Sequence, residues 1–187
     1  MMEILSFKSP REFRAWLAKN HGQSSGIMLR IYKKGSGATS LTHAEALDQA
    51  LCYGWIDGQK KPGDGGSWLQ KFTPRRPNSG WSKNNTQRAQ RLIESGEITP
   101  AGLKEVKAAK RDGRWKAAYD SFSNATIPDD FLQALAKAKK AKAFFETLNR
   151  TNLYSIAYRL QTAKMPETRS RRIKTIIAML SRGEKFH

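Results

Sequence analysis

The spacing of hydrophobic residues predicts a front part that mixes strands and helices. Two short apolar or alternating segments bounded by glycine or proline, Ile27–Tyr32 and Trp68–Thr73, are typical of strands. Residues 10–19 and 43–52 instead place apolar side chains three or four positions apart, which indicates amphipathic helices. We also expect a short edge strand within Glu3–Phe7. Glycines should end the second helix. Taken together, these elements predict that the front part of the chain is a small β-α-β-α-β sheet region.

The two front helices have marked beginnings. Ser9 is followed three residues later by Glu12, and Thr42 by Glu45. In each pair the Ser or Thr and the Glu can satisfy backbone amides of the first turn, which is the capping-box pattern. We therefore expect both pairs to form capping boxes, with Pro10 at the first helical position.

From Ser82 onward the pattern is helical throughout. Apolar stripes at helical spacing follow Ser82, Thr99, Pro128 and Pro166, and another runs from 153 to 160. The lysine-rich segment 137–142 fits either a solvated helical face or a short break. The least structured stretch is 121–126, so we predict an α+β fold with an α+β domain at 1–120 and a helical module at 121–187.

Several classes of protein are disfavoured by what the sequence lacks. The chain has 187 residues with one cysteine, Cys52, and three histidines, which excludes an internal disulfide and every cysteine-based zinc site. No glycine-rich phosphate loop is present, and no apolar run approaches the ~18 residues of a membrane span. The first residues carry an acid where a signal peptide has bases. We expect a cytoplasmic protein with no metal or cofactor.

Charge is the clearest compositional signal. The formal net charge is +18, from 34 Lys and Arg against 16 Asp and Glu. Most of the excess follows residue 57, because residues 58–120 and 121–187 each contribute +8. Such a balance is typical of proteins that bind polyanions, here single-stranded nucleic acid, a nucleotide or an anionic membrane surface. The alternative is that the protein is basic only for solubility.

Aromatic and basic residues alternate within residues 53–83, a pattern that suits stacking on bases and contact with phosphates. Pro74 and Pro77 predict an extended, rigid presentation of the two arginines between them. We expect Trp55 and Trp68 in the core and Trp81 partly exposed. The candidate ligand-binding residues are Tyr53, Trp55, Asp57, Lys71, Arg75, Arg76, Trp81 and Lys83.

Four residues leave alternatives open. Cys52 is better explained as buried packing than as a nucleophile, because His43 lies about 13 Å away along the same predicted helix. Asp57 is compatible with a general base and equally with Asp-Gly turn chemistry. His43 reads most simply as an exposed polar residue. Arg169 lies in line with an apolar stripe, where snorkelling is favoured over pairing with a buried acid.

Several strings resemble one family. Residues 45–58, which include Cys-Tyr-Gly-Trp-Ile-Asp-Gly, resemble a hallmark of the YdeI/OmpD-associated, bacteriocin-protection family, as do residues 72–76, 81–85 and 99–102. The run 163–173 resembles the final helical module of that family. The resemblance implies protection against bacteriocins or cationic peptides, and the family name suggests an outer-membrane porin partner and a periplasmic address. The absence of an export signal argues against that address.

Three functions follow from these observations. The resemblance favours a non-enzymatic stress or antimicrobial-protection protein that acts through a basic-aromatic binding surface. The charge favours a nucleic-acid-binding accessory protein. Asp57 with Arg75 or Arg76 would suit a small enzyme with an anionic substrate, which has the weakest support. The basic C-terminal residues Arg171, Arg172 and Lys174 are explained by solvent exposure alone.

Overall fold

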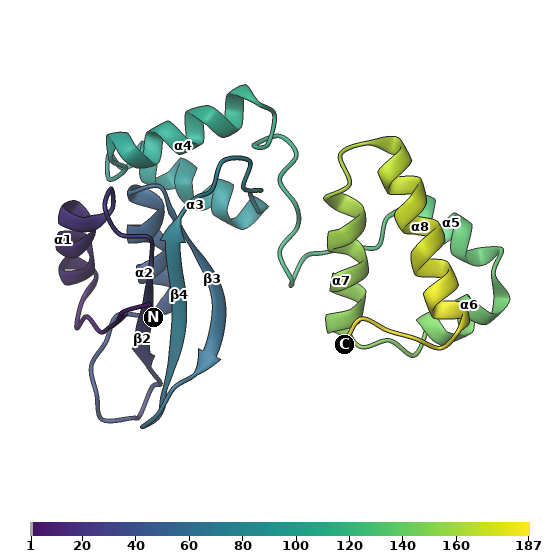
Figure 1. Ribbon diagram of the computed structural model, residues 1–187, viewed down its shortest axis with the longest axis horizontal. Helices are drawn as coiled ribbons and strands as arrows, with labels where there is room; N and C mark the ends of the chain where they lie inside the picture. Colours follow the sequence, from purple (N-terminus) through teal and green to yellow (C-terminus); the bar gives the residue numbers. More distant parts are fainter. Residues whose placement is uncertain (1) are drawn as a thin grey trace. The chain divides into compact units, whose positions relative to one another are not determined.

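The computed structural model describes residues 2–187, which fold as two compact units (Figure 1). The first unit comprises the chain up to Trp81 together with Asn85–Lys116, and the second comprises Ser82–Asn84 together with Ala117–His187. The fold is α+β, as predicted. No helix within residues 2–187 combines the length and the hydropathy needed to cross a membrane.

The first unit is built on a four-stranded sheet. Its strands are β1 (Ile4–Leu5), β2 (Ile27–Tyr32), β3 (Trp55–Pro62) and β4 (Ser67–Pro74), in the order β1-β2-β4-β3. β1 runs parallel to β2, whereas β4 runs antiparallel to both of its neighbours. β3 and β4 therefore form a hairpin whose turn lies at one end of the sheet.

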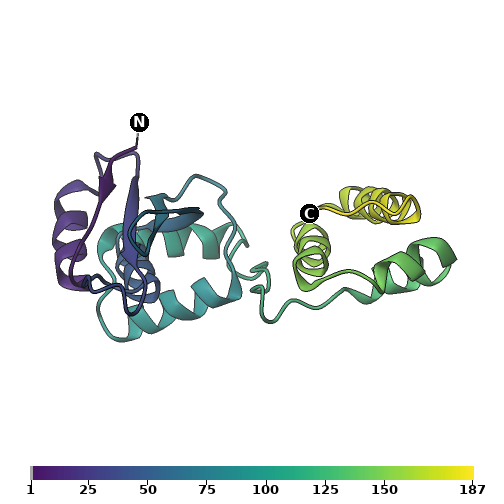
Figure 2. The same cartoon turned by 90° about the horizontal axis from the view of Figure 1, so that it is seen from below.

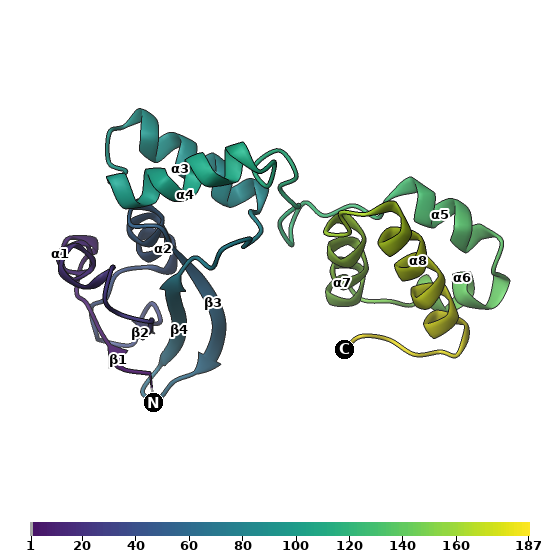
Figure 3. The same ribbon diagram turned by 45° about the horizontal axis from the view of Figure 1, so that its top comes forward.

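Helices α1 (Pro10–Asn20) and α2 (His43–Cys52) cover one face of this sheet (Figure 3). Alternate residues of β2 point toward them and are almost completely buried. On β4 the ring of Phe72 faces the same way, and it contacts Phe13 of α1 and His43 of α2, with ring centroids 5.8 and 6.3 Å apart. The alternation read from the sequence thus corresponds to one covered face.

The two predicted capping boxes differ in outcome. Thr42 and Glu45 form a complete box, in which each side chain accepts a hydrogen bond from the backbone N–H of the other residue. Ser9 accepts from the N–H of Glu12, but Glu12 accepts from the N–H of Lys8, at 2.8 Å, and not from that of Ser9. The prediction of a complete capping box at Ser9 and Glu12 was therefore wrong, although α1 begins where expected.

Helices α3 (Lys83–Glu94) and α4 (Pro100–Arg111) run side by side in all three views (Figures 1 to 3). The start of α4 is fastened to the end of α2, because the carbonyl oxygen of Cys52 accepts hydrogen bonds from both N and Oγ1 of Thr99, at 3.1 and 2.6 Å. A Cβ added to Gly102 would lie 2.4 Å from that same oxygen. Only glycine permits this approach.

The second unit is all-helical, with α5 (Asp129–Ala136), α6 (Lys139–Phe145), α7 (Arg150–Gln161) and α8 (Pro166–Ser181). In Figure 1, α8 lies between α7 and the α5–α6 arm. Each of the two alternatives for the lysine-rich segment holds for part of it, because residues 137–138 form a short break between α5 and α6, whereas Lys139, Lys140 and Lys142 are exposed on α6. The buried core of the unit consists of Phe131, Leu135, Ala141, Ile156, Leu160, Ile176 and Leu180.

Arg169 does not snorkel. Its Nε and Nη2 donate to the two carboxylate oxygens of Asp130 at 2.6 and 2.7 Å, and Nη1 donates to the carbonyl of Leu160. The favoured alternative was therefore wrong, because the acid arrives from α5, far away in sequence. The guanidinium lowers the pKa of Asp130, so this pair stabilises the unit above the unfolded pKa of an aspartate and is lost as the pH falls through the lower folded value.

The segment after α8 returns to the start of α7 (Figure 1). Asn152 of α7 holds it there with a side chain that is only 1% exposed. Its Oδ1 accepts from the backbone N–H groups of Phe186 and His187, both at 3.1 Å, and its Nδ2 donates to the carbonyl of His187. One buried amide thus fixes where the ring of Phe186 stands.

Candidate functional site

The candidate binding residues do not converge on one site. Trp55 is 1% exposed and its Nε1 donates to the carbonyl of His21, so its predicted place in the core is confirmed. Trp81 is 2% exposed, which corrects the expectation of partial exposure. The glycine before it led to that expectation, but a glycine in a loop says nothing about what packs over the next ring.

Trp81 is buried between two other side chains. The guanidinium carbon of Arg75 lies 3.6 Å from the centre of its ring, and the ring of Trp115 lies 5.0 Å away. Arg75 is itself only 7% exposed and donates through Nη1 to the carbonyl of Gly80. Arg75 and Arg76 are therefore not a pair of accessible cations. Arg75 closes the loop over Trp81, and Arg76 alone is exposed.

Asp57 lies in β3 and not in a turn, because it pairs in register with Phe72 of β4. Its carboxylate oxygen Oδ2 is 3.1 Å from Nε2 of His43. His43 is thus a half-buried partner of Asp57, which corrects its interpretation as a simple exposed residue. Helical spacing alone did not reveal this pair, since the two side chains meet only when α2 packs against the sheet.

Three further candidates lie apart from one another. Tyr53 follows the end of α2, with the guanidinium carbon of Arg14 5.7 Å from its ring centre. Lys71 lies in the middle of β4, opposite Met28 of β2. Lys83 belongs to the second unit and forms an ion pair with Asp120 at 2.7 Å, and this contact lowers the pKa of the aspartate.

A basic groove does form in the first unit, at the hairpin end of the sheet. It has a volume of about 450 Å³ and is lined by Lys33, Lys60, Lys61 and Trp68, with Pro62, Gly63 and Ser67. Nζ of Lys60 stands 4.6 Å from the centre of the half-buried Trp68 ring. We call these seven residues the hairpin groove. Trp68 was expected in the core, and the structure leaves it partly exposed.

The lysines of the hairpin groove have no acidic partner. Within residues 2–187, no carboxylate oxygen lies within 4 Å of Nζ of Lys33, Lys60 or Lys61. The nearby acid of the hairpin turn, Asp64, is paired with Arg30. The positive charge of the groove is therefore available to an anion. Lys33 was not among the candidates taken from the sequence, because it follows β2 and does not belong to the β3–β4 hairpin that carries Lys60 and Lys61. The Lys-Lys-Gly string that begins at Lys33 is nevertheless a signal that could have identified it.

Cys52 is 0% exposed, and burial raises the pKa of its thiol, against the opposing effect of the nearby Arg14. We expect Cys52→Ala to cost roughly 1 kcal/mol in free energy of unfolding, and the native thiol to react with a thiol reagent only on unfolding. Urea titration followed by tryptophan fluorescence and timed labelling check this. Rapid labelling of the folded protein would show a reactive thiol.

Among residues 2–187, no three His, Cys, Asp or Glu side chains come together in a group that could hold a metal ion.

Comparison with known proteins separates the chain into two matches. Residues 5–105 match a family described as a domain of unknown function, DUF8412, which is more than half of the chain. Residues 124–183 match the family described as "Bacteriocin-protection, YdeI or OmpD-Associated". The run 163–173 lies in the second match, whereas the strings at 45–58, 72–76, 81–85 and 99–102 lie in the first. No curated protein and no solved structure matches the chain.

Proposed function

Because the chain belongs to the DUF8412 family and carries a YdeI/OmpD-associated module at residues 124–183, we propose that it is a non-enzymatic bacteriocin-protection protein that binds a polyanion in its hairpin groove. The description of the second family provides the protective role at family level. The cytoplasmic location expected from the sequence is kept as part of this proposal.

The charge argues for an indirect route of protection. A protein with a net charge of +18 repels a cationic antimicrobial peptide, so direct sequestration is physically disfavoured. An anionic partner is instead attracted to it. Protection through contact with a nucleic acid or nucleotide in a stress response fits the sign of the charge.

The hairpin groove carries this proposal. It joins three unpaired lysines to an aromatic face, which are the two elements that single-stranded nucleic-acid sites use. Lysine charges displace counterions from the phosphates, and a base can stack on the exposed part of Trp68. The dispersed positions of Arg75, Trp81 and Lys83 make them poor alternatives, since the first two are buried and Lys83 is paired.

The test compares two double variants that remove equal charge. We expect Lys60→Ala with Lys61→Ala to weaken binding of a labelled oligothymidine of about ten nucleotides by about tenfold or more at ~0.1 M salt. The slope of log affinity against log salt should fall by up to about 1.4, for two lost contacts on a single strand. Fluorescence anisotropy measures both quantities.

The matched control is Lys139→Ala with Lys140→Ala, two exposed lysines at the start of α6. It should change the affinity much less, and only the wild type and this control should restore bacteriocin survival to cells that lack the protein. Equal losses in the two doubles would mean diffuse attraction without a groove site. Restored survival with the Lys60/Lys61 double would separate protection from the groove.

A further inference from the structure

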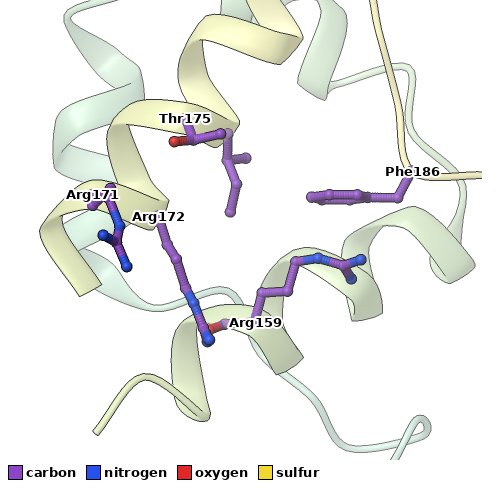
Figure 4. A pocket seen from close by; sticks show the side chains of 6 residues that line it. Arg159, Arg171, Arg172, Thr175 and Phe186 are labelled. Carbon is purple, nitrogen blue, oxygen red and sulfur yellow. The ribbon is translucent and has the colours of Figure 1, made fainter. Parts of the chain in front are cut away.

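A second hollow lies in the helical unit, independent of the hairpin groove. Its volume is about 290 Å³, and its lining residues are Arg159, Arg171, Arg172, Thr175, Ile176 and Phe186. Figure 4 shows Arg171, Arg172 and Thr175 projecting from α8, Arg159 from α7, and Phe186 from the segment that follows α8. We call this hollow the arginine pocket.

Two of the three arginines are held in place before any ligand binds. The guanidinium carbon of Arg159 lies 3.9 Å from the centre of the Phe186 ring, and Asn152 fixes the backbone of Phe186. Arg172 donates through Nη1 to the carbonyl of Arg159 and to the hydroxyl of Thr162, which leaves its other two nitrogens available. Cations that are already positioned lose little conformational entropy on binding.

The charge of the arginine pocket is not offset within the protein. Among residues 2–187, no carboxylate oxygen lies within 4 Å of the side-chain nitrogens of Arg159, Arg171 or Arg172, although Arg169 on the same helix pairs with Asp130. The apolar residues of the lining, in contrast, are Phe186 and the almost completely buried Ile176. Solvent exposure of one helix face does not explain why cations from two elements line the same hollow as these apolar residues.

We propose that the arginine pocket binds a phosphate monoester carried by a small apolar or aromatic body. A phosphate monoester has a charge of about −1.5 to −2 at pH 7, which suits the neighbouring cations Arg171 and Arg172 better than a single carboxylate does. The guanidinium of Arg159 lies on the other side, against Phe186, and adds to the positive field (Figure 4). The hydroxyl of Thr175 adds a hydrogen-bond donor at the same place. The apolar body lies against Phe186, beside the small exposed part of Ile176, and the small volume limits it to about one ring.

The test uses phenyl phosphate as the probe, with inorganic phosphate and benzyl alcohol as its two halves. Titration of the full chain is followed in two-dimensional amide NMR spectra. We expect phenyl phosphate to bind about tenfold or more tightly than either half, because charge and apolar surface act together. The largest shifts should fall on residues 171–176 and 186, in the second unit, so the result does not depend on the hairpin groove.

Three variants separate the parts of the site. Arg171→Gln should weaken the binding of phenyl phosphate and of inorganic phosphate alike, by about fivefold to tenfold. This change should leave the unit folded, because Arg171 is exposed and has no ion-pair partner in the described chain. Phe186→Leu should weaken phenyl phosphate alone. Lys137→Gln, which removes an exposed charge elsewhere in the unit, should change neither. Equal affinities for phenyl and inorganic phosphate, or equal effects of Arg171→Gln and Lys137→Gln, would overturn the proposal.

The same chemistry is offered by a free phosphate monoester and by the headgroup of phosphatidic acid. Sedimentation with vesicles that contain phosphatidic acid distinguishes these sources. Retention that Arg171→Gln and Phe186→Leu both reduce, while Lys137→Gln does not, assigns the pocket to a lipid. Binding of phenyl phosphate without such retention assigns it to a free ester.

Discussion

Trp81→Ala is expected to lower the free energy of unfolding of the first unit by about 3–5 kcal/mol, the cost of emptying a fully buried aromatic site. The ring is 2% exposed and fills the space between the guanidinium of Arg75 and the ring of Trp115. Its removal takes away both contacts and leaves the buried charge of Arg75 without its aromatic face. Urea unfolding followed by fluorescence measures the loss.

The probe and the controls make this measurement specific. All five tryptophans lie in the first unit, so fluorescence reports on that unit alone, while circular dichroism reports on both. Trp81→Phe should cost much less, because Nε1 of Trp81 is buried without a hydrogen-bond partner in the described chain and only packing area is lost. Trp68→Ala, at a half-buried ring, should cost about 1–2 kcal/mol. Similar losses at positions 68 and 81 would contradict the burial of Trp81.

Gly102→Ala is expected to destabilise the first unit by about 3 kcal/mol or more, although alanine normally favours a helix by about 1 kcal/mol over glycine. The sign reverses here because the new Cβ would lie 2.4 and 2.6 Å from the carbonyl oxygens of Cys52 and Leu51. Both are backbone atoms at the end of α2 and cannot swing aside. α4 must therefore move away from α2, which breaks the hydrogen bonds from Thr99 to Cys52.

Gly22→Ala is the matched control for this change. Nothing lies within 4 Å of a Cβ added at Gly22, so its stability should stay within about 0.5 kcal/mol of the wild type. Fluorescence-detected urea titration compares the two variants directly. A Gly102→Ala protein as stable as the wild type would mean that α4 does not depend on this close approach.

These contacts give the most distinctive string of the sequence, at residues 45–58, a structural role. Gly54, whose φ is +74°, turns the chain from α2 into β3, and an added Cβ there would lie 3.1 Å from the carbonyl oxygen of Ala101. The strings at 45–58 and 99–102 therefore meet at one joint between α2 and α4. Cys52 contributes its carbonyl to that joint and keeps its thiol buried.

The local signals were sufficient where a feature depends on neighbours in the chain. Hydrophobic spacing identified three of the four strands and both helices that precede β3, because the periods of strand and helix determine which residues can be buried. β3 (Trp55–Pro62) was missed from the predicted β-α-β-α-β order, since most of its residues are exposed and do not alternate. The capping box at Thr42 and the helix start at Pro166 are equally local. Charge composition predicts an anionic partner, since the sign of the field needs no coordinates, and this stays a prediction.

Tertiary structure alone decided which side chains are available for function. Packing placed Trp115 against Trp81, brought His43 to Asp57, and paired Arg169 with Asp130, in each case by joining elements that are separated in sequence. It also gathered Lys33 with Lys60, and Arg159 with Arg172, into two basic hollows that no single stretch of the chain contains. Burial and ion pairing depend on what the rest of the chain places beside a residue, and a one-dimensional pattern does not carry that information.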